Sequence, residues 1–189
     1  MRRPTPAEHE LQEALRAAQR GDAHGFAQLW RTLQPAVLRY LRVVIGDQAE
    51  DAASETWLHV IRDLDRFDGD LAAFRGWLFR IARHRAIDLR RHRRSFPWPG
   101  ADLVAPDAAT VAFERGSTDW AVGLIATLPA DQAEAVMLRI VAGLDVATTA
   151  QILGKRPGAI RIATMRGLRR LATHPQVNAR IAREPAGEG

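Results

Sequence analysis

The sequence contains no cysteine and a single lysine, Lys155, among its 189 residues. Without cysteine the chain can form no disulfide, no thiolate metal site and no cysteine nucleophile, which suits a reducing compartment. No apolar run approaches the roughly 20 residues that a membrane-spanning helix needs, and residues 1–20 lack the apolar centre of a signal peptide. We therefore expect a cytoplasmic protein with no membrane insertion.

Because lysine is so scarce, all but one of the 27 basic residues are arginine, and the net charge is +5. The guanidinium group contacts phosphates and purine edges through two parallel hydrogen bonds, which a lysine cannot form. GC-rich coding produces the same bias, so the argument depends on where the arginines lie. The 47% of hydrophobic residues is sufficient for one core or two small ones.

Residues 74–94 concentrate the arginines on one side of a predicted helix. At 100° per residue one arc is apolar and contains Phe74, Trp77, Leu78, Ile81 and Leu89. The opposite arc gathers Arg80, Arg83, His84, Arg90, Arg91 and Arg94, with Ile87 in its middle. Such a face repels itself unless a polyanion lies along it, and nucleic acid is the obvious polyanion.

The segments before this helix also show helical periodicity. Residues 9–20 predict a marginal helix, and residues 24–46 predict a long one that Pro35 kinks or splits. Asp47 and Glu50 have the spacing of a capping box for a third helix. A short loop over residues 66–70 then ends at Asp70, which can cap the arginine-rich helix.

The composition changes after residue 95. Residues 96–120 hold three prolines, two glycines and four acids against one arginine, which predicts a linker between two domains. Beyond it, Asp145 as an N-cap, Gly154 after a short helix and Pro157 at the start of the next helix indicate a helix-turn-helix. We expect the tail from Thr173 to fray. The sequence contains no credible strand, so the predicted fold class is all-α.

The last predicted helix turns Arg161, Ile162, Met165 and Arg169 outward, with Arg166 at the border. A solvated amphipathic helix without function would carry similar charges. Two exposed apolar residues among arginines favour DNA reading, because groove-binding helices combine arginine forks with apolar contacts to thymine methyl groups.

Three carboxylates, Asp47, Asp51 and Glu55, stack on the outer side of the third predicted helix. They could bind a divalent metal, complement the helix dipole, or dock a protein with Trp57 and Leu58 as apolar companions. No histidine or second carboxylate cluster joins them, so we expect no metal, no cofactor, no small-molecule substrate and no catalytic residue. A metal-dependent enzyme stays a rival hypothesis, as does a stand-alone helix-turn-helix regulator.

Four stretches together resemble extracytoplasmic-function (ECF) sigma factors, the small two-domain branch of the sigma-70 family. They are A-E-D-A-A-S-E-T-W (49–57), F-R-G-W-L-F-R-I-A-R-H-R-A-I-D-L-R-R (74–91), L-P-A-D-Q-A-E-A-V-M-L-R (128–139) and G-K-R-P-G-A-I-R-I-A-T-M-R-G-L-R-R-L (154–171). The resemblance implies a region 2-like domain over 22–95 and a region 4-like helix-turn-helix over 121–173. An N-terminal extension (1–21), the acidic linker (96–120) and a flexible tail (174–189) complete the chain.

The resemblance also implies partners and site residues. Core RNA polymerase would be bound through its β′ clamp helices and β flap, and the residues that dock on the clamp would be Asp47, Glu50, Asp51, Glu55 and Trp57. The −10 promoter element would meet Arg66, Phe67 and Asp68, whose loop captures a flipped base, and Arg80, Arg83, His84, Ile87 and Arg91. The −35 element would meet Lys155, Arg156, Arg161, Ile162, Met165 and Arg166. An anti-sigma factor is the implied inhibitor.

The sequence departs from the family pattern at three places. His84 stands where many members carry asparagine, and Ile162 where serine or arginine is frequent. Ala147, Thr148 and Thr149 replace the usual acidic pair and isoleucine before the turn. Because base contacts depend on such positions, the promoter sequence cannot be transferred from the family.

Overall fold

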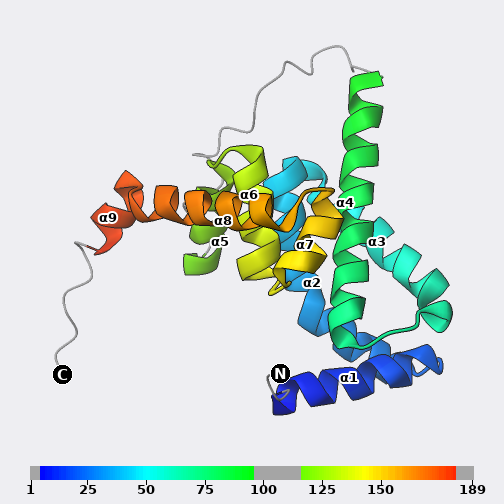
Figure 1. Cartoon of the computed structure of the whole chain (residues 1–189). Helices are drawn as coiled ribbons and strands as arrows, with labels where there is room; N and C mark the ends of the chain where they lie inside the picture. The colour runs from blue at the N-terminus through cyan, green and yellow to red at the C-terminus, as the bar shows by residue number, and fades with distance from the viewer. Residues whose placement is uncertain (1–4, 96–115, 182–189) are drawn as a thin grey trace.

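The computed structural model describes residues 5–95 and 116–181, and every regular element in these two ranges is helical (Figure 1). This confirms the predicted all-α class. The first range contains α1 (Pro6–Gln19), α2 (Ala23–Ile45), the 3₁₀ turn η1 (Gly46–Gln48), α3 (Ala49–Asp63), the 3₁₀ turn η2 (Leu64–Arg66) and α4 (Leu71–Ser95). The second contains α5 (Gly116–Ala126), α6 (Ala130–Val136), the π-helical turn η3 (Met137–Val141), α7 (Val146–Leu153), α8 (Pro157–Ala172) and α9 (Pro175–Ile181).

The helix-turn-helix is bounded as its sequence predicts. Asp145 precedes α7, and its side chain accepts a hydrogen bond of 2.7 Å from the backbone N–H of Thr148. Gly154 ends α7 in the left-handed conformation at φ 63°, which glycine adopts without a steric penalty. Pro157 then starts α8. These three predictions are confirmed.

Of the two outcomes predicted for Pro35, a kink or a split, the split is wrong, because α2 runs through this residue as one helix. Arg31, whose carbonyl loses its helical partner there, is exposed and can bond to water instead. Asp47 does not cap α3, because η1 keeps it inside a helical turn and leaves Gln48, with no side-chain cap bond, as the residue before α3. An N-cap residue needs an extended backbone, which this turn does not allow.

Two helices also lie where irregular structure was expected. Helix α5 begins at Gly116, inside the predicted linker, of which residues 96–115 lie outside the described residues. Helix α9 continues the chain beyond Thr173, and the guanidinium of its Arg180 lies 4.6 Å from the centre of the Trp120 ring on α5. A cation over an aromatic face is stabilising, so this contact helps to hold α9 in place.

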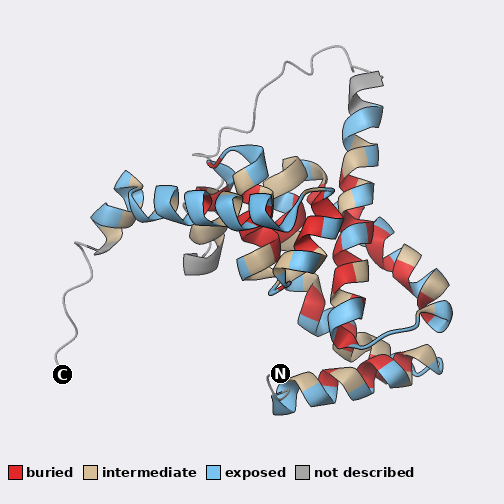
Figure 2. Cartoon of the chain, in the orientation of Figure 1, coloured by how far each residue is buried: buried red, intermediate tan, exposed pale blue. Residues whose placement is uncertain are grey.

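The two halves of the chain pack into one body around α2 (Figure 1). Helices α5 and α6 lie against α2, and α7 lies against α4. The buried residues of both halves form one continuous cluster, and Figure 2 marks buried residues on helices of each half. The α4–α7 contact is close at Gly76, where an added Cβ would lie 2.7 Å from Cγ2 of Thr148. The two predicted domains are therefore in direct contact in this structure.

Candidate nucleic-acid interface

The loop between η2 and α4 is built on aromatic rings. Phe67 stacks on Trp77, with ring centres 5.1 Å apart and planes 23° apart, and meets the edge of Phe74 at 5.6 Å. Gly69 has φ 155°, and a Cβ there would lie 2.9 Å from the Phe67 ring. Asp70 caps α4 as predicted, accepting a 2.8 Å hydrogen bond from the N–H of Ala73. Aromatic packing at Phe67 and the Asp70 cap therefore fix where the loop leaves η2 and where it enters α4.

The residues predicted to meet the −10 element lie on this loop and along α4. Arg66 and Asp68 are exposed, and Phe67 between them in the sequence is half-buried. Farther along α4, Arg80, His84 and Arg91 are exposed, whereas Arg83 and Ile87 are half-buried. Asp88 pairs with Arg85 at 3.8 Å. The structure thus gathers an arginine-rich face on α4. We call this set the α4 arginine face: Arg80, Arg83, His84, Ile87 and Arg91.

Arg83 differs from the rest of this face because it meets the other half of the chain. Its Nε lies 3.3 Å from a carboxylate oxygen of Glu134 on α6, and the same oxygen accepts a 3.0 Å hydrogen bond from the hydroxyl of Tyr40 on α2. Burial, and then the Glu134 carboxylate, raise the pKa of Tyr40 well above its ordinary value of 10.0. Neither Tyr40 nor Glu134 was singled out from the sequence, because no local pattern relates positions 51 and 94 residues apart.

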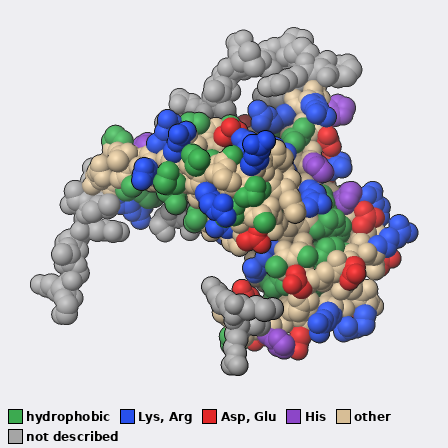
Figure 3. All heavy atoms as spheres, viewed as in Figure 1, with side chains coloured by type: hydrophobic (Ala, Val, Ile, Leu, Met, Phe, Trp, Pro, Cys, Tyr) green, Lys and Arg blue, Asp and Glu red, His purple; other side chains and the backbone are tan. Residues whose placement is uncertain are grey.

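The outer face of α8 carries arginines and apolar side chains side by side. Arg161 and Arg166 are exposed, and Ile162 and Met165 are 48% and 43% exposed. Figure 3 shows the mixture of basic and hydrophobic side chains along this helix. A shallow groove on this side is lined by Arg139, Val146, Arg161, Thr164, Met165, Leu168, Arg169 and Ala172. Its mixture of apolar and basic lining residues suits a base edge beside a phosphate backbone.

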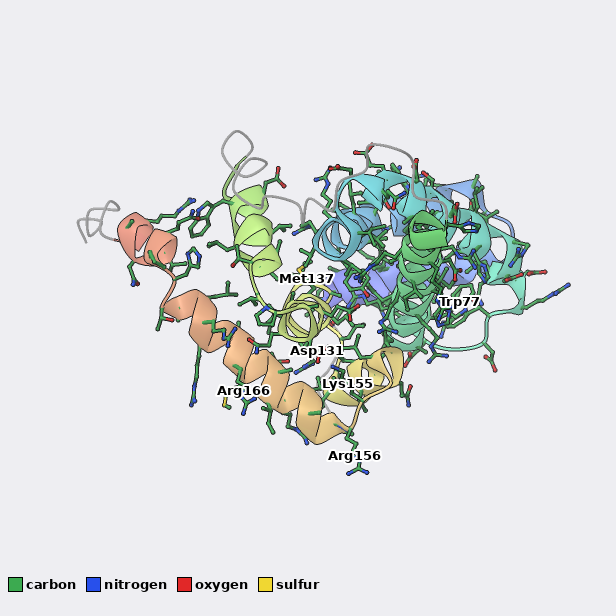
Figure 4. The ribbon with its side chains drawn as sticks, turned by 90° about the horizontal axis from the view of Figure 1, so that it is seen from above. Trp77, Asp131, Met137, Lys155, Arg156 and Arg166 are labelled. Carbon is green, nitrogen blue, oxygen red and sulfur yellow. The ribbon has the colours of Figure 1, made fainter. Side chains whose placement is uncertain are left out.

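Lys155 and Arg156 stand at the turn before α8 but point in different directions (Figure 4). The Lys155 ammonium nitrogen lies 2.6 Å from a carboxylate oxygen of Asp131 on α6. Arg156 is exposed and points away from the body of the protein. Of the two, only Arg156 is presented to solvent without an acidic neighbour in the described residues.

The predicted docking residues divide between the surface and the core. Asp47, Glu50, Asp51 and Glu55 are exposed, and Glu50 lies 3.6 Å from Arg42 of α2. Trp57 is 5% exposed, and its indole N–H donates a 2.6 Å hydrogen bond to Gln34 of α2, so it supports α3 from beneath. Two apolar side chains of α3 are exposed instead, Leu58 at 66% and Ile61 at 56%. We call Asp51, Glu55, Leu58 and Ile61 the α3 outer surface.

The described residues also bear on metal sites, clusters of charged side chains and membrane-spanning helices. No group of three or more histidine, aspartate or glutamate side chains in residues 5–95 and 116–181 is arranged to hold a metal ion. His59 and Arg62 both contact Asp63, at 3.2 and 3.1 Å, and the hydrogen bonds from Arg62 lower the pKa of that carboxyl. None of the described helices is both long and apolar enough to cross a membrane.

Comparison with known proteins identifies the family to which this chain is similar. Residues 29–96 match sigma-70 region 2, and residues 119–171 match sigma-70 region 4. The chain is 36% identical to the ECF RNA polymerase sigma factor ShbA of Streptomyces griseus over 167 residues, covering 80% of this chain and 87% of that protein. It is 32% identical to SigD of Mycobacterium tuberculosis, covering 85% and 82%.

Among solved structures, the sigma factor RpoE of Bartonella quintana, in complex with the anti-sigma factor NepR, has a similar fold. Its TM-score is 0.61 at 24% identity, over 78% of this chain and 94% of that one. The protein belongs to the sigma-70 family. Within it, the chain is an ECF sigma factor, a subunit that directs RNA polymerase in promoter-specific transcription initiation. This confirms the resemblance seen in the sequence, and a stand-alone regulator is not favoured.

Proposed function

We propose that the chain recognises a promoter with two surfaces, the loop and α4 arginine face at the −10 element and the outer face of α8 at the −35 element. The corresponding units are residues 22–95 and 121–173, joined by residues 96–120 and flanked by the extension 1–21 and the tail 174–189. The observation that carries the proposal is the α8 face, where Ile162 and Met165 remain exposed between Arg161 and Arg166. Leaving apolar side chains in water is unfavourable unless a partner covers them.

At the −10 element, Arg80, His84 and Arg91 would meet the phosphate backbone while the loop receives an unpaired base. Flipping a base costs a few kcal/mol of stacking energy. Stacking on an aromatic side chain returns about 1–3 kcal/mol per base. The Phe67–Trp77 stack supplies such a ring, and the exposed Arg66 and Asp68 beside it can hydrogen-bond to base edges.

The α3 outer surface is the proposed docking site for the β′ clamp helices of core polymerase. Its acidic first half and apolar second half offer charge complementarity to a basic helix and a hydrophobic centre, the combination that stable interfaces use. Trp57 would support this docking by holding α3 against α2, and would not itself contact the clamp helices. The unit over 121–173 would meet the β flap.

The packed arrangement is too short to reach both promoter elements at once. Their centres are roughly 25 base pairs apart, which is about 85 Å at 3.4 Å per pair. A compact chain of 189 residues has a radius of gyration of about 16 Å. We therefore propose that the two halves separate, breaking the contacts of Glu134, when polymerase and promoter are bound.

The proposed inhibitor is an anti-sigma factor that covers the exposed surfaces of α3 and α8. Support comes from the relative RpoE, whose solved structure contains the anti-sigma factor NepR, and from the exposed apolar side chains Leu58, Ile61 and Ile162. Family members are DNA-binding initiation factors, and we propose that this chain has no enzymatic activity and acts in the cytoplasm, where its polymerase would be.

Run-off transcription tests the assignment. Purified core polymerase is presented with a promoter library, with and without the protein, and transcripts that require it are sequenced. Arg161→Ala should relax the base preference at one −35 position and cost about 1–3 kcal/mol of binding, whereas Arg80→Ala should weaken binding regardless of sequence. A preference that Arg161→Ala leaves unchanged would contradict the −35 assignment.

A further inference from the structure

Helix α1 lies outside the region 2 match, which starts at residue 29, yet it contacts the loop that we place at the −10 element. Figure 1 shows the loop running from α3 to α4 directly above α1. Two glutamines of α1 make the contacts. The side-chain N–H of Gln19 donates a 2.5 Å hydrogen bond to the carbonyl of Phe67. The backbone N–H of Leu71 donates a 2.6 Å hydrogen bond to the carbonyl oxygen of the Gln12 side chain.

These bonds hold the two ends of the loop and leave its tip free. Phe67 is the first residue after η2 and Leu71 the first of α4, so Asp68, Gly69 and Asp70 lie between the anchored positions, and all three are exposed. Gln12 and Gln19 are seven residues apart, which places them on one face of the helix, two turns or about 10.5 Å apart. One rigid helix therefore sets the distance between the loop's ends.

Helix α1 is well fixed for this role. Its start has a complete capping box between Thr5 and Glu8. Its apolar face, Leu11, Ala14, Leu15 and Ala18, is buried. Gly25 of α2 allows a close approach, since a Cβ there would lie 2.8 Å from the carbonyl oxygen of Ala14. A helix packed this tightly cannot follow a moving loop, so it can constrain the loop's shape.

We infer that Gln12 and Gln19 are positioning residues, which hold the loop of residues 67–70 in the shape that receives the flipped −10 base. A base pocket discriminates only if its groups are held in place before the base arrives, because a loop ordered by the base itself would spend binding energy on that ordering. The inference rests on the proposed role of the loop at the −10 element, and it adds the N-terminal helix to the recognition machinery.

The two glutamines differ in their hydrogen-bonding role, which allows a matched experiment. Gln12 accepts, so Gln12→Glu keeps an acceptor for the N–H of Leu71. Gln19 donates, so Gln19→Glu loses the donor and places a carboxylate against the carbonyl of Phe67. The same change, on the same helix, with the same charge, should therefore be tolerated at one position and harmful at the other. Because both changes add one negative charge to α1, Gln12→Glu is also the control for altered charge.

The experiment uses holoenzyme assembled from core polymerase and each variant. A fluorescent base analogue at the flipped position reports opening, and four promoters with each base at that position report discrimination. We expect Gln19→Glu to slow opening about fivefold or more, the factor that one net hydrogen bond represents, and to reduce discrimination. Gln12→Glu should stay within about twofold of the natural protein. Affinity for core polymerase and for −35 duplex should not change.

Two outcomes would overturn the inference. One is unchanged opening and discrimination in a folded Gln19→Glu protein; the other is an equal loss of core affinity, which would make the contact structural only. If Gln19→Glu does not fold, Gln12→Ala replaces it: amide hydrogen exchange at Leu71 should accelerate and discrimination fall, and unchanged values would refute the role. Asp68→Ala separates the two proposals, because no effect of that change on opening would contradict the loop's own role at the −10 element.

Discussion

The ammonium nitrogen of Lys155 lies 2.6 Å from a carboxylate oxygen of Asp131, so the chain's one lysine is paired within the protein. Lys155 is 33% exposed at its side chain and Asp131 is 72% exposed. A pair this exposed contributes roughly 0–1 kcal/mol to stability. It nevertheless competes with any phosphate that approaches Lys155.

Asp131→Asn should release Lys155 for DNA. We expect the free energy of unfolding to change by less than about 1 kcal/mol, while affinity for duplex −35 DNA rises a few-fold at low salt because one more cation can meet the phosphate backbone. Fluorescence anisotropy over a salt series measures this. Glu10→Gln removes the same charge from α1 and is the control; an equal gain there would show that only net charge matters.

Trp57 and Leu58 are neighbours in sequence but should respond differently to substitution. Trp57→Phe removes the 2.6 Å bond to Gln34 from a buried site and should lower the free energy of unfolding by about 1–2 kcal/mol, with polymerase affinity unchanged in the folded protein. Leu58→Ser should leave stability within about 0.5 kcal/mol and weaken binding to core polymerase. Urea titration and competition for core polymerase measure the two quantities. The reverse pattern would place Trp57 in the interface.

The contact between Gly76 and Thr148 provides a test of the packed arrangement. An added Cβ at Gly76 would lie 2.7 Å from Cγ2 of Thr148, so Gly76→Ala should force α7 away from α4. The same change favours α4 itself by up to about 1 kcal/mol, since alanine is the better helix former. Small-angle scattering should show a larger radius of gyration for Gly76→Ala and recovery when Thr148→Ser removes the methyl group. An unchanged radius would mean that the halves are already apart in solution.

Alkaline pH should weaken the packing around Tyr40. The phenol keeps its proton in the packed state, where its pKa is raised by burial and by Glu134 and opposed by Arg83. Its contribution is therefore complete below the ordinary pKa of 10.0 and is lost as pH rises from there toward the higher value. The slope approaches 1.4 kcal/mol per pH unit for one proton. Urea titrations on either side of pH 10 measure this loss of stability. In Tyr40→Phe the part of the loss that is due to Tyr40 should be absent.

The sequence predicts well what adjacent turns of one helix decide. The apolar and arginine arcs of α4, the caps at Asp70 and Asp145 and the left-handed turn at Gly154 each depend on residues within a few positions of one another. For the described side chains, which exclude that of Arg94, these predictions are confirmed because helical periodicity and capping are local. The sigma-70 motifs extend the prediction to both halves of the chain.

Contacts between distant segments were not predictable in this way. Trp57 falls beside the exposed carboxylates of α3 in sequence, yet its ring turns inward to Gln34. The roles of Gln12, Tyr40 and Glu134 depend on which helices pack together, and a single amphipathic pattern does not specify its partner. For η1, the backbone path set by Gly46 at φ 65° overrides a spacing that elsewhere forms a capping box.

The ion pair between Arg83 and Glu134 also affects how promoter binding responds to ionic strength. An arginine that meets a phosphate displaces a condensed cation, which contributes about −0.9 to the slope of log affinity against log salt. Arg83 already has an internal counter-charge 3.3 Å away, and Glu134 would attract a cation once Arg83 leaves it. The cation taken up by Glu134 partly cancels the cation that Arg83 displaces from DNA. The salt dependence of promoter affinity should therefore be weaker than the number of arginine–phosphate contacts predicts. Glu134→Gln should steepen the slope by up to about 0.9, bringing it closer to one displaced cation for each arginine–phosphate contact.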